Sequence, residues 1–75
     1  MRMTPRTFGQ LEVGNTIMWL DAVDAMCFLV VRKLWDTDGE PMLTFLHLRD
    51  GKLLTQTLAC DHRLDGYDVF VAEGT

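Results

Sequence analysis

The apolar positions of this chain fall into short runs that alternate with turn-forming residues, a pattern typical of a small all-β domain. The clearest example is residues 42–59, where two apolar runs flank Asp50-Gly51. An Asp-Gly pair between apolar runs is a strong β-hairpin signal, because these residues tolerate the positive φ angles of a tight turn. We therefore predict two antiparallel strands joined at this turn.

Two registers fit this hairpin. A two-residue loop pairs Leu48 with Leu53, whereas a three-residue loop with a glycine bulge shifts the partner strand and pairs Leu48 with Lys52. The sequence does not choose between them. In the first register, one face gathers large apolar side chains that we expect to be exposed, and such a patch usually marks an interface. This face carries Leu43, Phe45, Leu54 and Leu58.

Three further strands are expected at residues 16–21, 26–35 and 67–72. Residues 26–35 form a continuous apolar run rich in β-branched side chains, which favours a strongly bent strand in a small barrel. Ahead of the first strand, Phe8 and Leu11 are spaced to plug one end of that barrel from a turn or a single helical turn.

The chain length of 75 residues corresponds to one small domain. Residues 1–7 lack apolar periodicity, so we expect a flexible N-terminal arm ahead of a single β-barrel domain at residues 8–75. No apolar run reaches membrane-spanning length, and the N-terminus has no apolar signal-peptide core, which favours a cytoplasmic protein. In that reducing compartment, Cys27 and Cys60 are expected to be free thiols.

The overall charge argues against general affinity for nucleic acid. The formal net charge is −4, and an acidic body repels phosphates. Apolar residues make up 48% of the chain and charged residues 24%, which indicates a folded rather than a disordered protein. A local basic patch is the remaining route to nucleic acid, and its candidates are Arg32, Lys33, Arg49, Lys52 and Arg63.

The sequence contains no catalytic motif and no cofactor motif, so we expect neither an enzyme nor a bound cofactor. Asp36, Asp38 and Glu40 resemble the start of a calcium loop, and residues 36–41 are a predicted turn. The position of the bidentate glutamate, however, is occupied by His47 within a predicted strand. Residues 60–62 are three consecutive potential ligands, which rarely converge on one ion. We therefore expect no metal site.

The order of the predicted elements resembles that of the SH3-like small barrels, which have five strands, a strongly bent second strand and a 3₁₀ turn before the last strand. Residues 60–64 would supply that turn. The stretch FGQLEVGNTI at residues 8–17 is similar to the F-x-x-L-x-x-G-x-x-hydrophobic start of small phage and bacterial barrel proteins. The resemblance implies a small five-stranded all-β barrel. It transfers no function, because the acidic aromatic groove motif of peptide-binding SH3 domains is missing.

Three functions are compatible with these features. The first is a protein-protein interaction module, of the kind that a phage could encode to bind a host protein in the host cytoplasm. The chain has more large apolar residues than one small core needs, and aromatic residues are frequent interface anchors. The alternatives are a nucleic-acid-binding barrel that uses the basic patch, and a self-associating structural protein that forms a homodimer. The residues expected to contact a protein partner are Trp35, Phe45, Leu43, Leu54 and Leu58.

Overall fold

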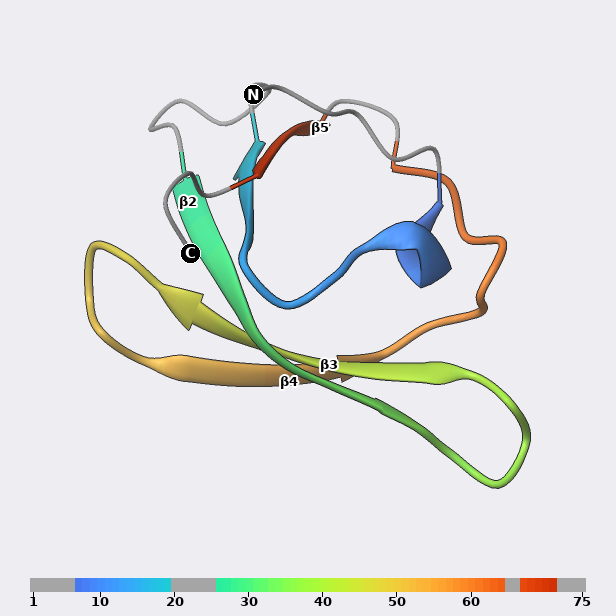
Figure 1. Cartoon of the computed structure of the whole chain (residues 1–75). Coiled ribbons are helices and arrows are strands. Elements are labelled where there is room, and N and C mark those ends of the chain that lie inside the picture. Colours follow the sequence, from blue (N-terminus) through green and yellow to red (C-terminus); the bar gives the residue numbers. More distant parts are fainter. Residues whose placement is uncertain (1–6, 20–25, 65–66, 72–75) are drawn as a thin grey trace.

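The computed structural model describes residues 7–19, 26–64 and 67–71, and these residues form one antiparallel sheet with a short helical turn. The order of strands in the sheet is β4-β3-β2-β1-β5 (Figure 1). All five predicted strands are confirmed, with ends close to the predicted ones. The elements are the 3₁₀ turn η1 (Phe8–Gln10) and the strands β1 (Asn15–Trp19), β2 (Met26–Trp35), β3 (Pro41–His47), β4 (Leu53–Thr57) and β5 (Tyr67–Val71).

The sheet is not closed into a barrel, because β4 and β5 lie at its two ends and do not pair with each other in the described residues. The prediction of an all-β chain with five antiparallel strands is therefore confirmed, whereas the described strands do not close into a barrel. The chain after β4 pairs with η1 instead. The backbone N–H groups of Phe8 and Gly9 donate to the carbonyl groups of His62 and Cys60, at 2.8 and 2.9 Å respectively. These bonds place η1 at the open side between the two arms of the sheet (Figure 1).

The helical turn predicted around Phe8 is confirmed as η1, whereas the 3₁₀ turn predicted before the last strand is wrong. At the start of η1, the backbone N–H of Thr7 donates to Oε1 of Gln10 at 3.0 Å. This contact satisfies a backbone donor that a short helix leaves without an internal partner. Residues 60–61 form an ordinary turn, closed by the hydrogen bond from His62 N–H to the Ala59 carbonyl at 3.0 Å. The backbone of this segment pairs with η1, so it does not continue as a helical turn.

β2 is long and bent, as its continuous apolar run predicts. It pairs with β1 through residues 26–29 and with β3 through residues 28–35, so it belongs to both arms of the sheet. Its register against β3 shifts between Val30 and Arg32, which leaves Val31 as the extra residue of a β-bulge. A bulge bends a strand and increases its twist. The bend turns β3 and β4 away from β1 and β5 (Figure 1).

The connection between β3 and β4 is longer than predicted, and both predicted registers are wrong. Leu46 lies opposite Leu53. The reason is a turn built on His47, whose Nδ1 accepts a hydrogen bond from the backbone N–H of Asp50 at 3.2 Å and whose carbonyl accepts one from Gly51 at 2.8 Å. The observed pairing is displaced by an even number of residues from the first predicted register. The same side chains therefore share a face, since side-chain direction alternates along a strand.

The core lies between the two arms of the sheet and is closed by η1. The ring of Phe45 packs against that of Phe8 and that of Phe28, with centroid distances of 6.2 Å in both cases. Leu43 is fully buried and Phe45 is 7% exposed, so the prediction that these two residues are exposed is wrong. The bend of β2 makes their face concave, and η1 covers it. The buried apolar residues, which include the predicted plug, are Phe8, Leu11, Ile17, Val30, Leu43, Phe45 and Val69.

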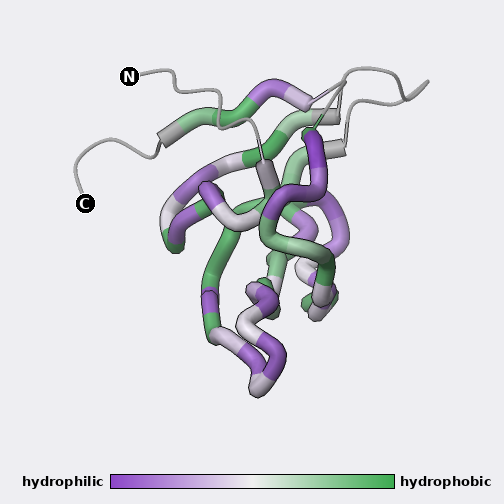
Figure 2. The backbone as a smooth tube through the Cα atoms, turned by 90° about the vertical axis from the view of Figure 1, so that its right-hand side faces the viewer, coloured by the Kyte–Doolittle hydropathy of each residue, from purple (hydrophilic) through white to green (hydrophobic). Residues whose placement is uncertain are grey.

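The turn predicted at residues 36–41 is confirmed, and Gly39 within it has a φ of +79°. Figure 2 shows that hydrophilic segments prevail at the turns, whereas the hydrophobic segments belong mainly to the strands. Cys27 and Cys60 are free thiols, as predicted. Residues 1–6 of the predicted N-terminal arm lie outside the described residues. Within the described ranges, no helix is long and apolar enough to span a membrane.

Candidate binding pocket

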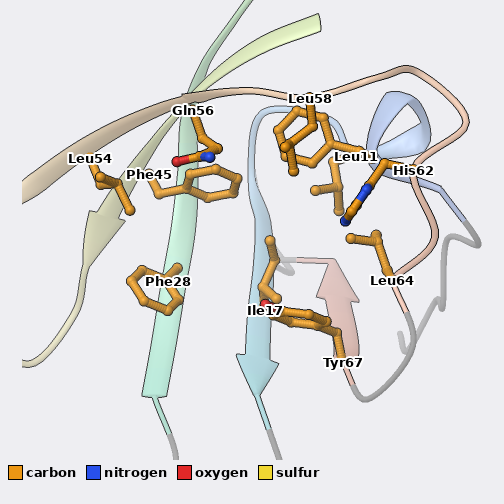
Figure 3. Close-up of a pocket in the computed structure, with 11 residues that line it drawn as sticks. Leu11, Ile17, Phe28, Phe45, Leu54, Gln56, Leu58, His62, Leu64 and Tyr67 are labelled. Atoms are coloured by element: carbon orange, nitrogen blue, oxygen red, sulfur yellow. The ribbon is translucent and has the colours of Figure 1, made fainter.

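An apolar pocket with a volume of about 260 Å³ opens between the two arms of the sheet (Figure 3). Buried residues of β1 and β3, Ile17 and Phe45, form part of its floor. Leu54 and Gln56 of β4 line one side, and the chain that follows β4 lines the other. The residues that surround the pocket are Phe8, Leu11, Ile17, Phe28, Phe45, Leu54, Gln56, Leu58, His62, Leu64 and Tyr67.

The pocket exists because the sheet is open. Leu54 and Gln56 point from β4 into the space above the core, as Figure 3 shows. In a closed barrel of few strands, side chains would fill the interior. Here β4 does not pair with β5 in the described residues, and the space between the two arms stays open. Leu54 is therefore 51% exposed, although it shares a face with the buried Phe45 that lies opposite it.

Packed aromatic rings form one wall of the pocket and extend behind it. The ring of Phe28 meets that of Phe45 edge-on, at an interplanar angle of 73°. The ring of Phe28 also lies 4.9 Å from the ring of His47, measured between centroids. Edge-to-face and tilted arrangements are favourable for aromatic rings. Because these rings contact one another, we expect the wall to keep its shape when a ligand binds, which lowers the entropy cost of binding.

Two exposed polar side chains, the amide of Gln56 and the imidazole of His62, stand among the apolar residues of the pocket. Each of them can donate and accept hydrogen bonds. The described residues that line the pocket include no carboxylate, serine, threonine or cysteine. The arrangement is suited to holding an apolar group, with a few polar contacts at the edge.

The structure brings together part of the surface that was predicted to contact a protein partner. Leu43 lies beneath the surface at 0% exposure and cannot reach a partner in this structure. Trp35, at the end of β2, is 55% exposed but is not part of the pocket, and the Nζ of Lys33 lies 5.1 Å from the centroid of its ring. The predicted contact residues that do line the pocket are Phe45, Leu54 and Leu58.

The predicted basic residues do not all share one surface. Arg32 and Lys33 are neighbours on β2, so their side chains point to opposite faces. The Nζ of Lys33 donates to the carbonyl oxygen of Gly9 at 2.8 Å and pairs with Glu12 at 3.1 Å, and its side chain is only 9% exposed. Lys33 therefore ties β2 to η1 and to the loop that follows it. Of the other candidates, Arg49 and Lys52 lie near the β3–β4 turn. Arg63 forms an isolated β-bridge with Thr7.

More than half of the residues that line the pocket were not predicted from the sequence as binding residues. One signal for it was present, since alternation places Gln56 between Leu54 and Leu58 on a single face of the hairpin. The other missed residues come from β1, β2, β5 and the chain after β4. They approach one another only through the bend of β2 and the position of η1, and no local pattern marks them. These residues are Ile17, Phe28, His62, Leu64 and Tyr67.

The carboxylates of the 36–41 turn also come together. Ligand atoms of Asp36, Asp38 and Glu40 lie within 4.8 Å of one another. The Oδ1 of Asp36 accepts hydrogen bonds from the backbone N–H groups of Asp38, at 2.9 Å, and of Glu40, at 2.8 Å. An aspartate that caps its own turn in this way is a common turn-stabilising feature, and it accounts for the close approach. The expectation that no metal binds here stays a prediction.

Comparison with known proteins found no matching family model, no similar curated protein and no similar solved structure. The function of the pocket must therefore be inferred from its own residues.

Proposed function

We propose that this protein is a small protein-protein interaction module whose pocket receives an apolar side chain of a partner protein. The observation that carries the proposal is the apolar pocket at the open side of the sheet. Its volume of about 260 Å³ lies below the range of about 300–1,000 Å³ that is typical of small-molecule sites. A space of this size suits one large side chain better than a cofactor. Anchors of this kind, inserted into pockets, often dominate the energy of an interface.

The surroundings of the pocket support this use. Leu54, which is 51% exposed, and the partly buried Leu58 flank it. Burial of their exposed parts against a partner would gain roughly 25 cal/mol per Å² of apolar surface. Gln56 and His62 would then hydrogen-bond polar groups next to the anchor, such as the partner's backbone. An apolar centre with a polar rim is the usual anatomy of a protein interface.

For the fold, we propose an open variant of the SH3-like small barrel. The position of β5 beside β1 and the bent β2 that serves both arms support this assignment. The resemblance of residues 8–17 to the start of small phage barrel proteins suggests a phage-encoded accessory protein as the biological setting. Its partner would then be a host protein.

Nucleic-acid binding through the basic residues has weaker support. The chain carries a net charge of −4, and the ammonium group of Lys33 is engaged with Gly9 and Glu12. A filter-binding assay at low salt tests this alternative. Retention of RNA or DNA at micromolar protein, lost on Lys52→Ala, would favour it over the protein partner.

A pull-down with matched variants tests the pocket. Tagged wild type, Leu54→Ser and Leu53→Ser are incubated with nuclease-treated bacterial lysate, and the bound proteins are quantified by mass spectrometry. Leu53 is the control because it is the neighbouring residue of β4 and is more exposed, at 67%, but its side chain points to the opposite face. We expect a protein that wild type and Leu53→Ser enrich equally and that Leu54→Ser captures about tenfold less, as for an interface anchor. Equal capture by all three, or no specific capture by wild type, would contradict the proposal.

A further inference from the structure

β4 is an edge strand without the usual protection against pairing. It pairs with β3 along one side, and no strand of the described chain lies along its other side. Every residue of the strand is exposed, including Leu53 at 67%. Its sequence, LLTQT, contains no charge, proline or glycine, and its register against β3 runs without a bulge. Natural edge strands usually carry one of these features, because an unprotected edge accepts another strand.

The direction of the backbone groups along β4 follows from a hydrogen bond at the turn. The N–H of His47 donates to the carbonyl of Lys52 at 2.8 Å, and these residues continue the register of the β3–β4 ladder. In an antiparallel ladder, opposed pairs alternate between hydrogen-bonded and non-hydrogen-bonded. Leu54 and Gln56 therefore direct their backbone groups toward β3. The free edge presents the N–H and C=O groups of Leu53, Thr55 and Thr57.

Opposite charges stand beyond the two ends of β4. Lys52 precedes the strand and Asp61 follows it; both are exposed, and neither forms an ion pair with another described residue. With a two-fold axis at Thr55, Lys52 of one strand lies across from Leu58 of the other, three residues short of Asp61, and Asp61 lies toward the basic end of the partner strand. The strand between them is uncharged, so no like charges oppose each other along it. The edge of β4 is thus complementary to itself.

We propose that β4 pairs in antiparallel orientation with β4 of a second copy of this chain, about a two-fold axis at Thr55. In this register Thr55 opposes its counterpart and Leu53 opposes Thr57, so each outward N–H meets a C=O group. The side chains of these residues lie on the outer face of the sheet, where Leu46 is the neighbour of Leu53 and Met42 that of Thr57. The pairing extends the rows of side chains on this outer face into the second copy. It also covers part of the Leu53 side chain. It does not depend on what the pocket binds.

Sedimentation velocity of the full chain tests the pairing. The average mass should rise from monomer toward dimer between about 10 μM and about 1 mM, by mass action. Thr55→Lys places two lysines opposite each other at the axis, and like charges in that position disfavour cross-strand pairing. We expect this change to raise the dimer dissociation constant about tenfold or more. The matched control is Thr37→Lys, the same substitution at an exposed turn position, which should leave the constant unchanged.

Thr55→Pro is an independent variant with the same expected result. Because the N–H of Thr55 faces away from β3, a proline there removes a hydrogen bond of the dimer and none of the β3–β4 ladder. Charge exchange tests the ends of the interface. Lys52→Asp alone should weaken the dimer modestly, and Lys52→Asp combined with Asp61→Lys should recover part of that loss, because the two charges stand three residues apart along the facing strands.

Amide hydrogen exchange gives a readout that needs no variant. The N–H groups of Leu53, Thr55 and Thr57 should exchange more slowly at high protein concentration than at low concentration. Exchange at these amides that does not depend on concentration would overturn the proposal. So would a chain that is monomeric at about 1 mM, which would leave the edge to a different protein, or a dimer that Thr55→Lys and Thr37→Lys affect equally.

Discussion

β3 and β4 are neighbouring strands of one hairpin, and they have different surroundings. Along β3, burial alternates between buried and half-buried residues, whereas along β4 every residue is exposed. Leu43 of β3 and Leu54 of β4 are the same residue type on the same face of the hairpin, and their exposures are 0% and 51%. The two residues differ in which structural elements lie over them. The bend of β2 places β3 under η1 and β1, while β4 lies at the free edge. Alternation defines the faces of a strand, and the strand's position in the sheet decides whether a face is buried.

This difference divides the apolar face of the hairpin between two roles. Where the face is covered, its side chains contribute to the stability of the fold through burial. Where it is not covered, the same kind of side chain forms the wall of the pocket and the proposed contact with a partner. Three substitutions test this division, in order of decreasing expected effect.

Leu43→Ala should lower the free energy of unfolding by about 2–5 kcal/mol, because it removes a fully buried side chain and leaves a cavity in the core. The measurement is urea denaturation at low protein concentration. Leu54→Ala is the matched control on β4 and should change the free energy of unfolding by about 1 kcal/mol or less. Equal losses in the two variants would mean that both strands are covered to the same degree.

Gly9→Ala should weaken the packing of η1 over the core. A Cβ atom at this position would overlap the Sγ of Cys60 and lie 2.9 Å from its carbonyl oxygen. That carbonyl also accepts the hydrogen bond from Gly9 N–H, so it cannot move away without weakening this bond. We expect a loss of about 1–3 kcal/mol, as for other overpacked sites. Unfolding measured in the Cys60→Ala background separates the two contacts. In that background, Gly9→Ala should regain only part of the lost free energy of unfolding, because the carbonyl oxygen of residue 60 stays in place. If Gly9→Ala alone were as stable as wild type, this result would contradict the close approach of η1 to residues 60–62.

Lys33→Met should have the smallest effect of the three. It keeps an apolar side chain of similar length, but it leaves the carbonyl of Gly9 without its donor and Glu12 without its cation. We expect the free energy of unfolding to fall by about 1.5–2 kcal/mol, the lower part of the range of about 1.5–3 kcal/mol for a hydrogen bond to a charged group. Thermal unfolding provides the measurement. Lys52→Met, at an exposed position, should stay within about 0.5 kcal/mol of wild type; similar losses for both lysines would argue against a structural role for Lys33.

Local chemistry was sufficient to locate the strands. The predicted bounds of the bent strand, residues 26–35, coincide with those of β2, because its apolar run ends at clear turn residues. The hairpin register was not accessible in this way. It depends on Nδ1 of His47 accepting a hydrogen bond from the backbone of Asp50, and the apolar pattern carries no information about such a contact. The prediction that Leu43 and Phe45 are exposed failed because alternation does not indicate which face becomes concave.

By itself, the sequence determined the number of the strands and their order along the chain, the turn at residues 36–41 and the side chains that share a face. These features follow from φ preferences and from a period of two, which act over a few neighbouring residues. Only the tertiary structure decided the register of the hairpin, the burial of Leu43, the pocket and the free edge of β4. These depend on the bulge at Val31 and on hydrogen bonds between η1 and residues 60–62. Such contacts join segments far apart in the chain, so no local preference specifies them.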